Sequence, residues 1–119
     1  MKFEGTGIDN LTAELTRLDD AMEQHGFIRA GQWDYERVTY DRKLEQRGEI
    51  FYLRIQGFTT EGDTGGRHAI VKLMTPLLGK HYYPHGVEYG EGEDFPEQIV
   101  QSCENTLKRL KQELEAIIR

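Results

Sequence analysis

Glu49-Ile-Phe-Tyr-Leu-Arg-Ile-Gln-Gly-Phe58 is the stretch that decides the fold of this 119-residue chain. Successive side chains of a β-strand point to opposite faces of the sheet, so these residues separate into two alternating sets. One set is apolar and the other is mixed: Phe51, Leu53 and Ile55 against Tyr52, Arg54, Gln56 and Phe58. The alternation predicts a strand that buries its first set in a core and turns its second set toward water, a ligand or a partner.

The residues before this strand alternate in the same way and predict its hairpin partner. From Glu36 to Leu44 one side of the chain is apolar and the other is polar: Val38, Tyr40 and Leu44 against Arg37, Thr39, Asp41 and Lys43. Glu45 to Gly48 is typical of a hairpin connection. Earlier in the chain, Phe27 to Gln32 begins a strand region, which Trp33 to Tyr35 either continues or turns.

The residues after the strand predict a second hairpin. Thr59 to Gly66 is rich in glycine and polar residues, as a hairpin loop is. In the following stretch, Arg67 to Leu78, two sets alternate again: Ala69, Val71 and Leu73 against His68, Ile70, Lys72 and Met74. From Pro76 onward, prolines and glycines predict irregular loop with short extended pieces around Tyr82 and Val87.

Two amphipathic helices are predicted near the ends of the chain. Asp9 or Asn10 is expected to cap the first helix, and Gly26 is expected to end it in the left-handed conformation that glycine accepts. Its apolar stripe consists of Leu11, Leu15, Leu18 and Met22. Asp94 is expected to start the second helix, with Glu97 completing a capping box and Pro96 in the first turn. Its stripe consists of Ile99, Cys103, Leu107, Leu110, Leu114 and Ile117.

These elements predict an α+β fold in two layers. A short lead-in at Lys2 to Thr6 supplies an edge strand, and both helices cover the same face of an antiparallel meander sheet. The expected order is β-α-β-β-β-α, in a single domain over residues 1–119.

Composition narrows the class of protein and its compartment. No apolar run approaches the ~20 residues that a membrane span needs, and Met1 to Asn10 lacks the pattern of a secretory signal. The single cysteine, Cys103, excludes an internal disulfide, so a cytoplasmic location is expected. The formal charge of -6 disfavours attraction to nucleic acid or to an anionic membrane.

Several short motifs together resemble a known family. They are Gly26-Phe27, the Gly-x-Trp-Asp-Tyr run at Gly31 to Tyr35, Tyr40-Asp41 and the Tyr-Leu-Arg at Tyr52 to Arg54. In this order they resemble the YugN-like family of small proteins from Bacillus and its relatives. The resemblance covers most of the chain and implies a compact cytoplasmic α+β domain, with no activity or site residues to carry over.

No residue pattern predicts a catalytic, cofactor or metal site. His81 and His85 are four residues apart, but Pro84 argues against a helix that would align them, and paired cysteines are absent. Cys103 lies on the apolar stripe of the second helix, where a thiol acts as a small hydrophobe. Gly62, Gly65 and Gly66 precede a strand, whereas a phosphate-binding P-loop precedes a helix.

The mixed face of the sheet is therefore the candidate functional surface. Its predicted members are Tyr52, Arg54, Phe58, His68, Ile70, Lys72 and Met74. Three hypotheses follow, the first of which is a noncatalytic interaction module that forms a homo-oligomer through this face or its edge strand. The second is a domain or small enzyme that binds a small anionic ligand, with Arg54 as the anchor helped by His68 and Tyr52. The third is single-stranded RNA binding, which the missing RNP1 pattern disfavours.

Overall fold

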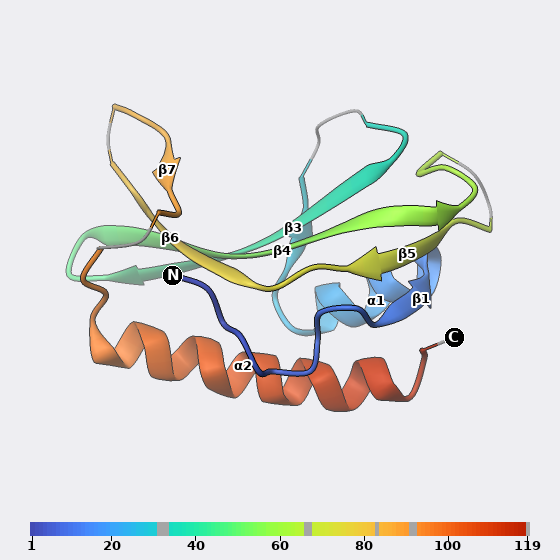
Figure 1. Cartoon of the computed structure of the whole chain (residues 1–119). Helices are drawn as coiled ribbons and strands as arrows, with labels where there is room; N and C mark the ends of the chain where they lie inside the picture. The colour runs from blue at the N-terminus through green and yellow to red at the C-terminus, as the bar shows by residue number, and fades with distance from the viewer. Residues whose placement is uncertain (31–33, 66–67, 83, 91–92, 119) are drawn as a thin grey trace.

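The computed structural model describes residues 1–30, 34–65, 68–82, 84–90 and 93–118. Figure 1 shows a twisted sheet above two helices. Trp33 and Arg67, which bound two of the predicted segments, lie outside the described residues. The elements in chain order are β1 (Thr12–Glu14), α1 (Leu15–Gln24), β2 (Ile28–Arg29), β3 (Arg37–Gln46), β4 (Glu49–Glu61), β5 (Ile70–Leu73), β6 (Leu77–His81), β7 (Val87–Glu88) and α2 (Glu97–Glu115).

The sheet is antiparallel and is organised around β4. Its main order is β1-β5-β4-β3-β2, and β6 also pairs with β4 and carries β7 on its far side. β3 occupies one edge of β4 from Glu49 to Phe58, so β5 and β6 share the other edge. The long β4 strand is thus the element on which the rest of the sheet is assembled.

Both helices pack against one face of the sheet, which confirms the predicted two-layer α+β architecture (Figure 1). Phe51, Leu53 and Ile55 each have 0% of their surface exposed, as the alternation predicted. Leu18 and Met22 of α1 and the stripe from Ile99 to Leu114 of α2 close this core. Neither of the two described helices combines the length and apolarity that a membrane crossing requires.

The β3–β4 turn fixes the register of the two central strands. Gln46 pairs with Glu49, so the connection has only two residues, Arg47 and Gly48. Their φ angles are 52° and 79°, as in the type I′ turn that matches the twist of a hairpin. Gly26, with φ of 82°, ends α1 as predicted.

The predicted start of the first helix is wrong. Residues Thr12–Glu14 form β1, which pairs with β5 through Ala13 and Val71, and the helix begins only at Leu15. Leu11 packs against the core from outside the helix. Pairing with a distant strand therefore overrides the helical periodicity at this end.

The predicted capping box of the second helix is also wrong. Pro96 is the N-cap residue, in an extended conformation with ψ of 138°, and no side chain caps the helix. The Pro96 carbonyl accepts hydrogen bonds from the N–H groups of Ile99 and Val100 at 3.0 and 3.1 Å. Asp94 stands two residues before the cap, too early to reach the first turn.

The prediction of one strand followed by irregular loop is wrong over residues 70–81. The chain instead forms two strands, β5 and β6, on either side of Pro76. Proline has no N–H to donate, but its carbonyl accepts a hydrogen bond from the Phe3 N–H at 2.9 Å. The N-terminal segment thereby contacts the sheet, and Lys2 pairs with Leu77 in an isolated bridge. The edge strand expected over residues 2–6 does not form, because glycines turn the chain directly after this bridge.

Candidate functional site

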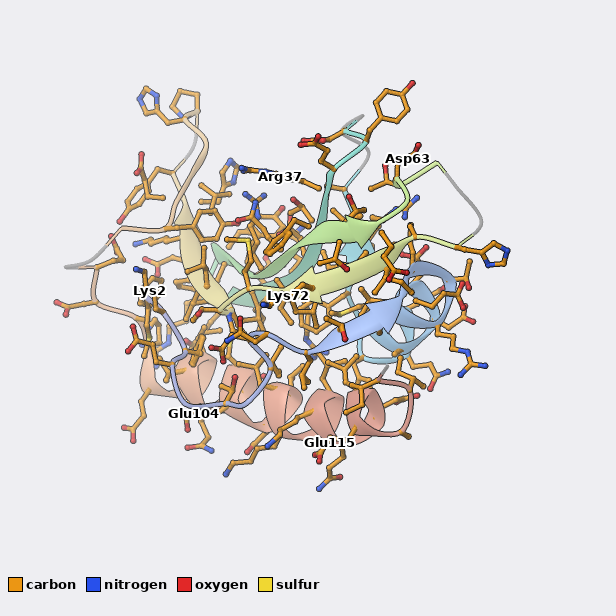
Figure 2. All side chains as sticks on the ribbon, turned by 45° about the vertical axis from the view of Figure 1, so that its right-hand side comes forward. Lys2, Arg37, Asp63, Lys72, Glu104 and Glu115 are labelled. Atoms are coloured by element: carbon orange, nitrogen blue, oxygen red, sulfur yellow. The ribbon has the colours of Figure 1, made fainter. Side chains whose placement is uncertain are left out.

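The face of the sheet turned away from the helices is called here the open face, and its side chains form cross-strand rows. One row joins Arg37 of β3, Phe58 of β4 and Lys72 of β5. A second row joins Asp41, Arg54 and Leu77, which come from β3, β4 and β6. Directly opposite residues of antiparallel strands have Cβ atoms about 5 Å apart, so each row is a set of neighbours. Figure 2 shows Arg37 and Asp63 on this side, away from Glu104 and Glu115 of α2.

Arg54 is held by Asp41 across the strands. Its Nε donates to Asp41 Oδ1 at 2.8 Å and its Nη2 donates to Oδ2 at 3.0 Å. The hydrogen bond to Asp41 raises the pKa of Arg54 above its usual value, while partial burial opposes the shift. The guanidinium carbon also lies 4.7 Å from the centroid of the Tyr89 ring. Arg54 therefore already has a paired anion and an aromatic cover.

Tyr89 reaches Arg54 because the chain after β6 folds back over the open face. A Cβ atom at Gly79 would lie 2.6 Å from the Tyr89 ring, so only glycine leaves room for it there. Burial, followed by the nearby Asp41 carboxylate, raises the pKa of Tyr89 to about 12. In the same region the Tyr52 ring meets His81 edge to face, with centroids 6.5 Å apart. This end of the open face is filled by the protein's own side chains.

The other end of the open face is accessible and basic. Phe58 is 39% exposed and stands between Arg37, which is exposed, and Lys72, which is half-buried. Among the residues that the structure describes, neither Arg37 nor Lys72 forms an ion pair. Met74, 44% exposed, lies one row away, and its N–H donates to the Gln56 carbonyl at 2.8 Å. An aromatic ring flanked by two cations that lack an ion-pair partner among the described residues is the most distinctive chemistry of this surface.

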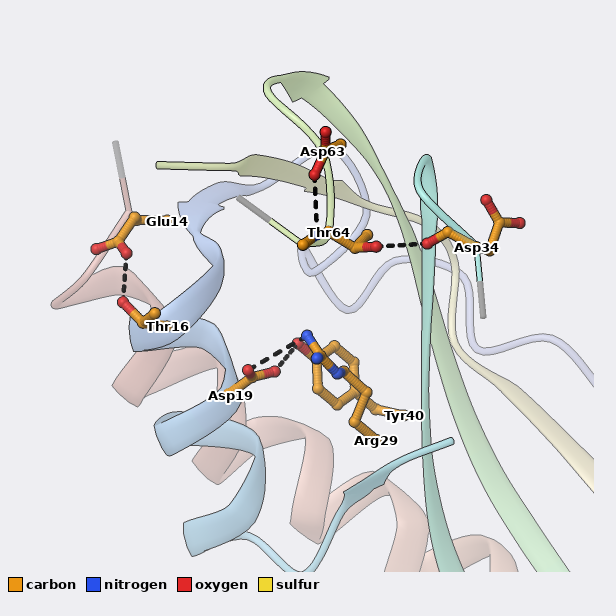
Figure 3. Close-up of polar contacts among 9 residues, drawn as sticks. Glu14, Thr16, Asp19, Arg29, Asp34, Tyr40, Asp63 and Thr64 are labelled. Carbon is orange, nitrogen blue, oxygen red and sulfur yellow. Dashed lines mark hydrogen bonds and ion pairs between the residues drawn. The ribbon is translucent and has the colours of Figure 1, made fainter. Parts of the chain in front are cut away.

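A shallow hollow of about 610 Å³ adjoins this row. Its lining comes from the loop before β3 and the end of β4: Tyr35, Glu36, Arg37, Phe58, Thr59, Thr60, Gly62 and Asp63. The Thr64 N–H donates to the Tyr35 carbonyl at 2.9 Å, and the Thr64 hydroxyl donates to the Asp34 carbonyl (Figure 3). These bonds tie the two loops together and fix the shape of the hollow.

Two predicted members of the face are not available on it. Ile70 is only 4% exposed, because it is enclosed between Glu14 of β1 and Glu61 of β4, so its predicted place on an accessible surface is wrong. His68 precedes β5 and lines a separate hollow with Glu14 and Arg17. It does not join Tyr52 and Arg54, because the strand that was predicted to carry it begins only at Ile70.

Three other groups of titratable side chains lie away from the open face, between the helices and the sheet. Cys103 has 0% of its surface exposed, and burial raises the pKa of its thiol to about 12. His25 at the end of α1 contacts Glu113 of α2, with Nε2 and Oε2 2.6 Å apart. Asp19 of α1 accepts from the Tyr40 hydroxyl at 2.6 Å and from Arg29 at 3.4 Å (Figure 3). Within the described residues, no group of three or more His, Cys, Asp or Glu side chains is arranged to hold a metal ion.

Comparisons with known proteins find relatives over most of the chain. Residues 5–108 match the model of the YugN-like family. The chain is 54% identical over 117 residues to the uncharacterised protein YlbA of Bacillus subtilis strain 168, covering 98% of both proteins. It is 27% identical over 100 residues to the uncharacterised protein YugN of the same strain, covering 83% of this chain and 75% of that protein.

A solved structure is similar over the same length. The crystal structure of the uncharacterised conserved protein YugN from Geobacillus kaustophilus HTA426 superposes with a TM-score of 0.85 at 55% identity. The match covers 98% of this chain and 96% of that one. With a family match over most of its length and these close relatives, the chain belongs to the YugN-like family.

Proposed function

We propose that this protein is a noncatalytic binding module whose open face holds a small anion bearing a flat ring. The observation that carries the proposal is the row Arg37, Phe58 and Lys72, in which an accessible ring stands between two cations without ion-pair partners in the described chain. An aromatic ring offers a stacking surface to a flat ligand. A guanidinium and an ammonium beside it supply the charge-assisted hydrogen bonds that a carboxylate or phosphate needs.

The spacing of the row suits one ligand rather than two. Adjacent strands lie about 4.8 Å apart, so the backbones that carry Arg37 and Lys72 are separated by roughly 10 Å with Phe58 between them. Both side chains are long and flexible enough to bend toward a shared anion above the ring. In a protein with a formal charge of -6, two neighbouring cations on one surface favour an anionic ligand there.

The residues that line the neighbouring hollow determine how the ligand is oriented. Glu36 and Asp63 lie beyond the strand ends, at the outer rim of the hollow. Their carboxylates repel an anion there, so the anionic group points inward to Lys72. The flat part of the ligand then rests on Phe58 and extends toward Tyr35, which is 54% exposed. A nucleoside monophosphate or an aromatic carboxylate has this combination of groups.

A thermal-shift screen tests the proposal, with inorganic phosphate, benzoate, the nucleoside monophosphates and a single-stranded oligonucleotide as probes. A probe at ~100 times its dissociation constant stabilises the fold by about 2.7 kcal/mol, which corresponds to a rise in Tm of roughly 10 °C. We expect a ring-bearing anion to produce this shift and phosphate alone to produce less.

Single substitutions with a matched control test whether Arg37, Phe58 and Lys72 bind the probe. Arg37→Gln and Lys72→Gln should each weaken the binding of an active probe about tenfold or more, since a hydrogen bond to a charged group contributes roughly 1.5–3 kcal/mol. Phe58→Ala should weaken it by a similar factor, since stacking on an aromatic side chain contributes about 1–3 kcal/mol per base. Arg109→Gln, an exposed position on α2, is the control for loss of charge and should bind normally. The proposal is contradicted if only Arg54→Gln weakens the binding of the active probe. It is also contradicted if no small anion raises the Tm of the natural sequence. A shift with the oligonucleotide alone would indicate nucleic-acid binding instead.

A further inference from the structure

In the part of the chain that the structure describes, no strand pairs with the outer edge of β3 beyond Asp41. On that side β3 pairs with the short β2, through Ile28 with Asp41 and Arg29 with Tyr40. Within the described residues, no strand pairs with this edge between Arg42 and Gln46. By contrast, the outer edge of β1 is bridged by Ile118 and that of β6 by β7 and Lys2. A row of strand hydrogen-bonding groups is therefore available on one side of the sheet.

The direction of these groups follows from the β2 pairing. The Ala30 N–H donates to the Thr39 carbonyl at 2.8 Å, so the main-chain groups of Thr39 point to the outer edge. Main-chain groups of a strand alternate between its two edges, so those of Lys43 and Glu45 also point outward. Both residues are exposed, and neither forms an ion pair within the described chain. The edge thus presents two hydrogen-bonding residues of opposite charge on either side of Leu44.

We propose that a second copy of this chain pairs with this edge, antiparallel and about a two-fold axis at Leu44. Lys43 then stands opposite the partner's Glu45, and Glu45 opposite the partner's Lys43. The main-chain N–H and C=O groups of Lys43 and Glu45 point outward in both copies. Each facing pair therefore exchanges two main-chain hydrogen bonds. This arrangement is isologous, so it closes at a dimer without leaving an open surface that would extend into fibres.

Charge selects this register over its neighbours. A two-fold axis at Lys43 would place the two lysines opposite each other, and an axis at Glu45 would oppose the two glutamates. Like charges directly opposite are destabilising, whereas the axis at Leu44 gives an attractive pair on each side. Leu44 itself, at 9% the most exposed member of the buried core, meets the partner's Leu44 on the helix side.

The position of the two-fold axis determines the architecture of the dimer, and the length of the paired segment limits its affinity. A two-fold axis between antiparallel strands is perpendicular to the sheet, so both open faces lie on the same side of one continuous sheet. Pairing over a few residues buries less area than a standard protein interface, so we expect a dissociation constant between about 1 µM and 1 mM. The dimer rests on the β3 edge alone and does not depend on a ligand at Arg37, Phe58 and Lys72.

Charge reversal at the edge gives the test, by sedimentation velocity over a concentration series up to about 1 mM. The expected result for the natural sequence is a reversible shift from monomer to dimer. Lys43→Glu and Glu45→Lys should each weaken dimerisation at least tenfold, because each opposes like charges on both sides of the axis. The double variant, Lys43→Glu with Glu45→Lys, should dimerise again because its facing residues have opposite charges. Mixing the two single variants should also restore dimerisation, because one copy is then acidic at this edge and its partner is basic.

Two controls keep the outcome interpretable. Arg109→Glu changes charge by the same amount on an exposed part of α2 and should dimerise normally. Circular dichroism verifies that each variant is folded, and the double variant carries the test even if one single variant is unstable. A natural sequence that stays monomeric at 1 mM overturns the proposal. A dimer that is indifferent to both reversals, or one that mixing does not restore, also overturns it.

Discussion

Asp41 and Arg54 face each other directly across β3 and β4 and are joined by two hydrogen bonds, of 2.8 and 3.0 Å. Their side chains keep 21% and 29% of their surface exposed, so water still screens the pair. The Tyr89 ring lies against the guanidinium and links the pair to the segment after β6. This contact divides the open face into a filled end and an accessible end.

Removing either partner of this pair should lower stability modestly. A double-mutant cycle with Asp41→Asn and Arg54→Gln, followed by urea unfolding, should give a coupling free energy of about 1 kcal/mol. That is the upper end of the range for partly exposed ion pairs, because the contact is bidentate. The coupling should fall when salt is raised to about 1 M. A coupling indistinguishable from zero at low salt would mean that the pair does not contribute to the stability of the fold.

Gly79 should be intolerant of any side chain. An added Cβ would lie 2.6 Å from the Tyr89 ring and 2.7 Å from a Val87 methyl group, so Gly79→Ala must displace the segment over the open face. We expect a loss of about 1–3 kcal/mol in the free energy of unfolding. Gly86→Ala is the matched control, because a Cβ there meets nothing within 4 Å. Equal effects of the two substitutions would contradict this packing.

Cys103 should be unreactive in the folded protein and should couple stability to alkaline pH. Burial raises the pKa of its thiol from 9.0 to about 12, so the unfolded chain loses this proton first as the pH rises. The free energy of unfolding should therefore decrease between pH ~9 and ~12.

The thiol contribution can be isolated with Cys103→Ala. Guanidinium unfolding at pH ~8 and ~10.5 should show a smaller decrease for this variant than for the natural sequence, since the tyrosines titrate equally in both. A thiol reagent such as DTNB should label Cys103 only at the rate of unfolding. Fast labelling of the native protein would show that the thiol is accessible.

Local periodicity was sufficient to predict the core and the architecture. The alternation of Phe51, Leu53 and Ile55 identified the buried face of β4, and the stripes of both helices identified what covers it. These signals are carried by neighbouring residues, so they can be read without knowing the tertiary structure. Gly26 could be assigned for the same reason, since its left-handed conformation is a local requirement.

Contacts between distant segments could not be predicted in this way. Pro76 and Gly79 are typical of irregular loop, yet β6 forms because the N-terminal segment and Tyr89 pack onto it. The partner of Arg54 depends on the register of β3 and β4, which the two-residue turn at Arg47 and Gly48 sets. Taking the turn as Glu45 to Gly48 left that register undetermined.

The candidate site was predicted in part. Alternation placed Phe58, Lys72 and Met74 on the open face, where the structure has them. Alternation also placed Arg37 on this face. Its part in the candidate site could not be predicted, because it depends on two facts of tertiary structure: Arg37 faces Phe58, and it has no ion-pair partner in the described chain. Ile70 alternates like its neighbours and is nevertheless buried, because β1 lies beside it.

The binding proposal is tested most directly by two-dimensional ¹H–¹⁵N NMR of the labelled protein, titrated with adenosine monophosphate. Saturable shifts should gather on the main-chain amides of Arg37, Phe58 and Lys72 and on the loop residues around Tyr35, and they should disappear in the Phe58→Ala variant. Amides near Tyr52 and Arg54, at the filled end, should move little. Shifts centred on Arg54, or shifts that persist without the Phe58 ring, would contradict the proposed site.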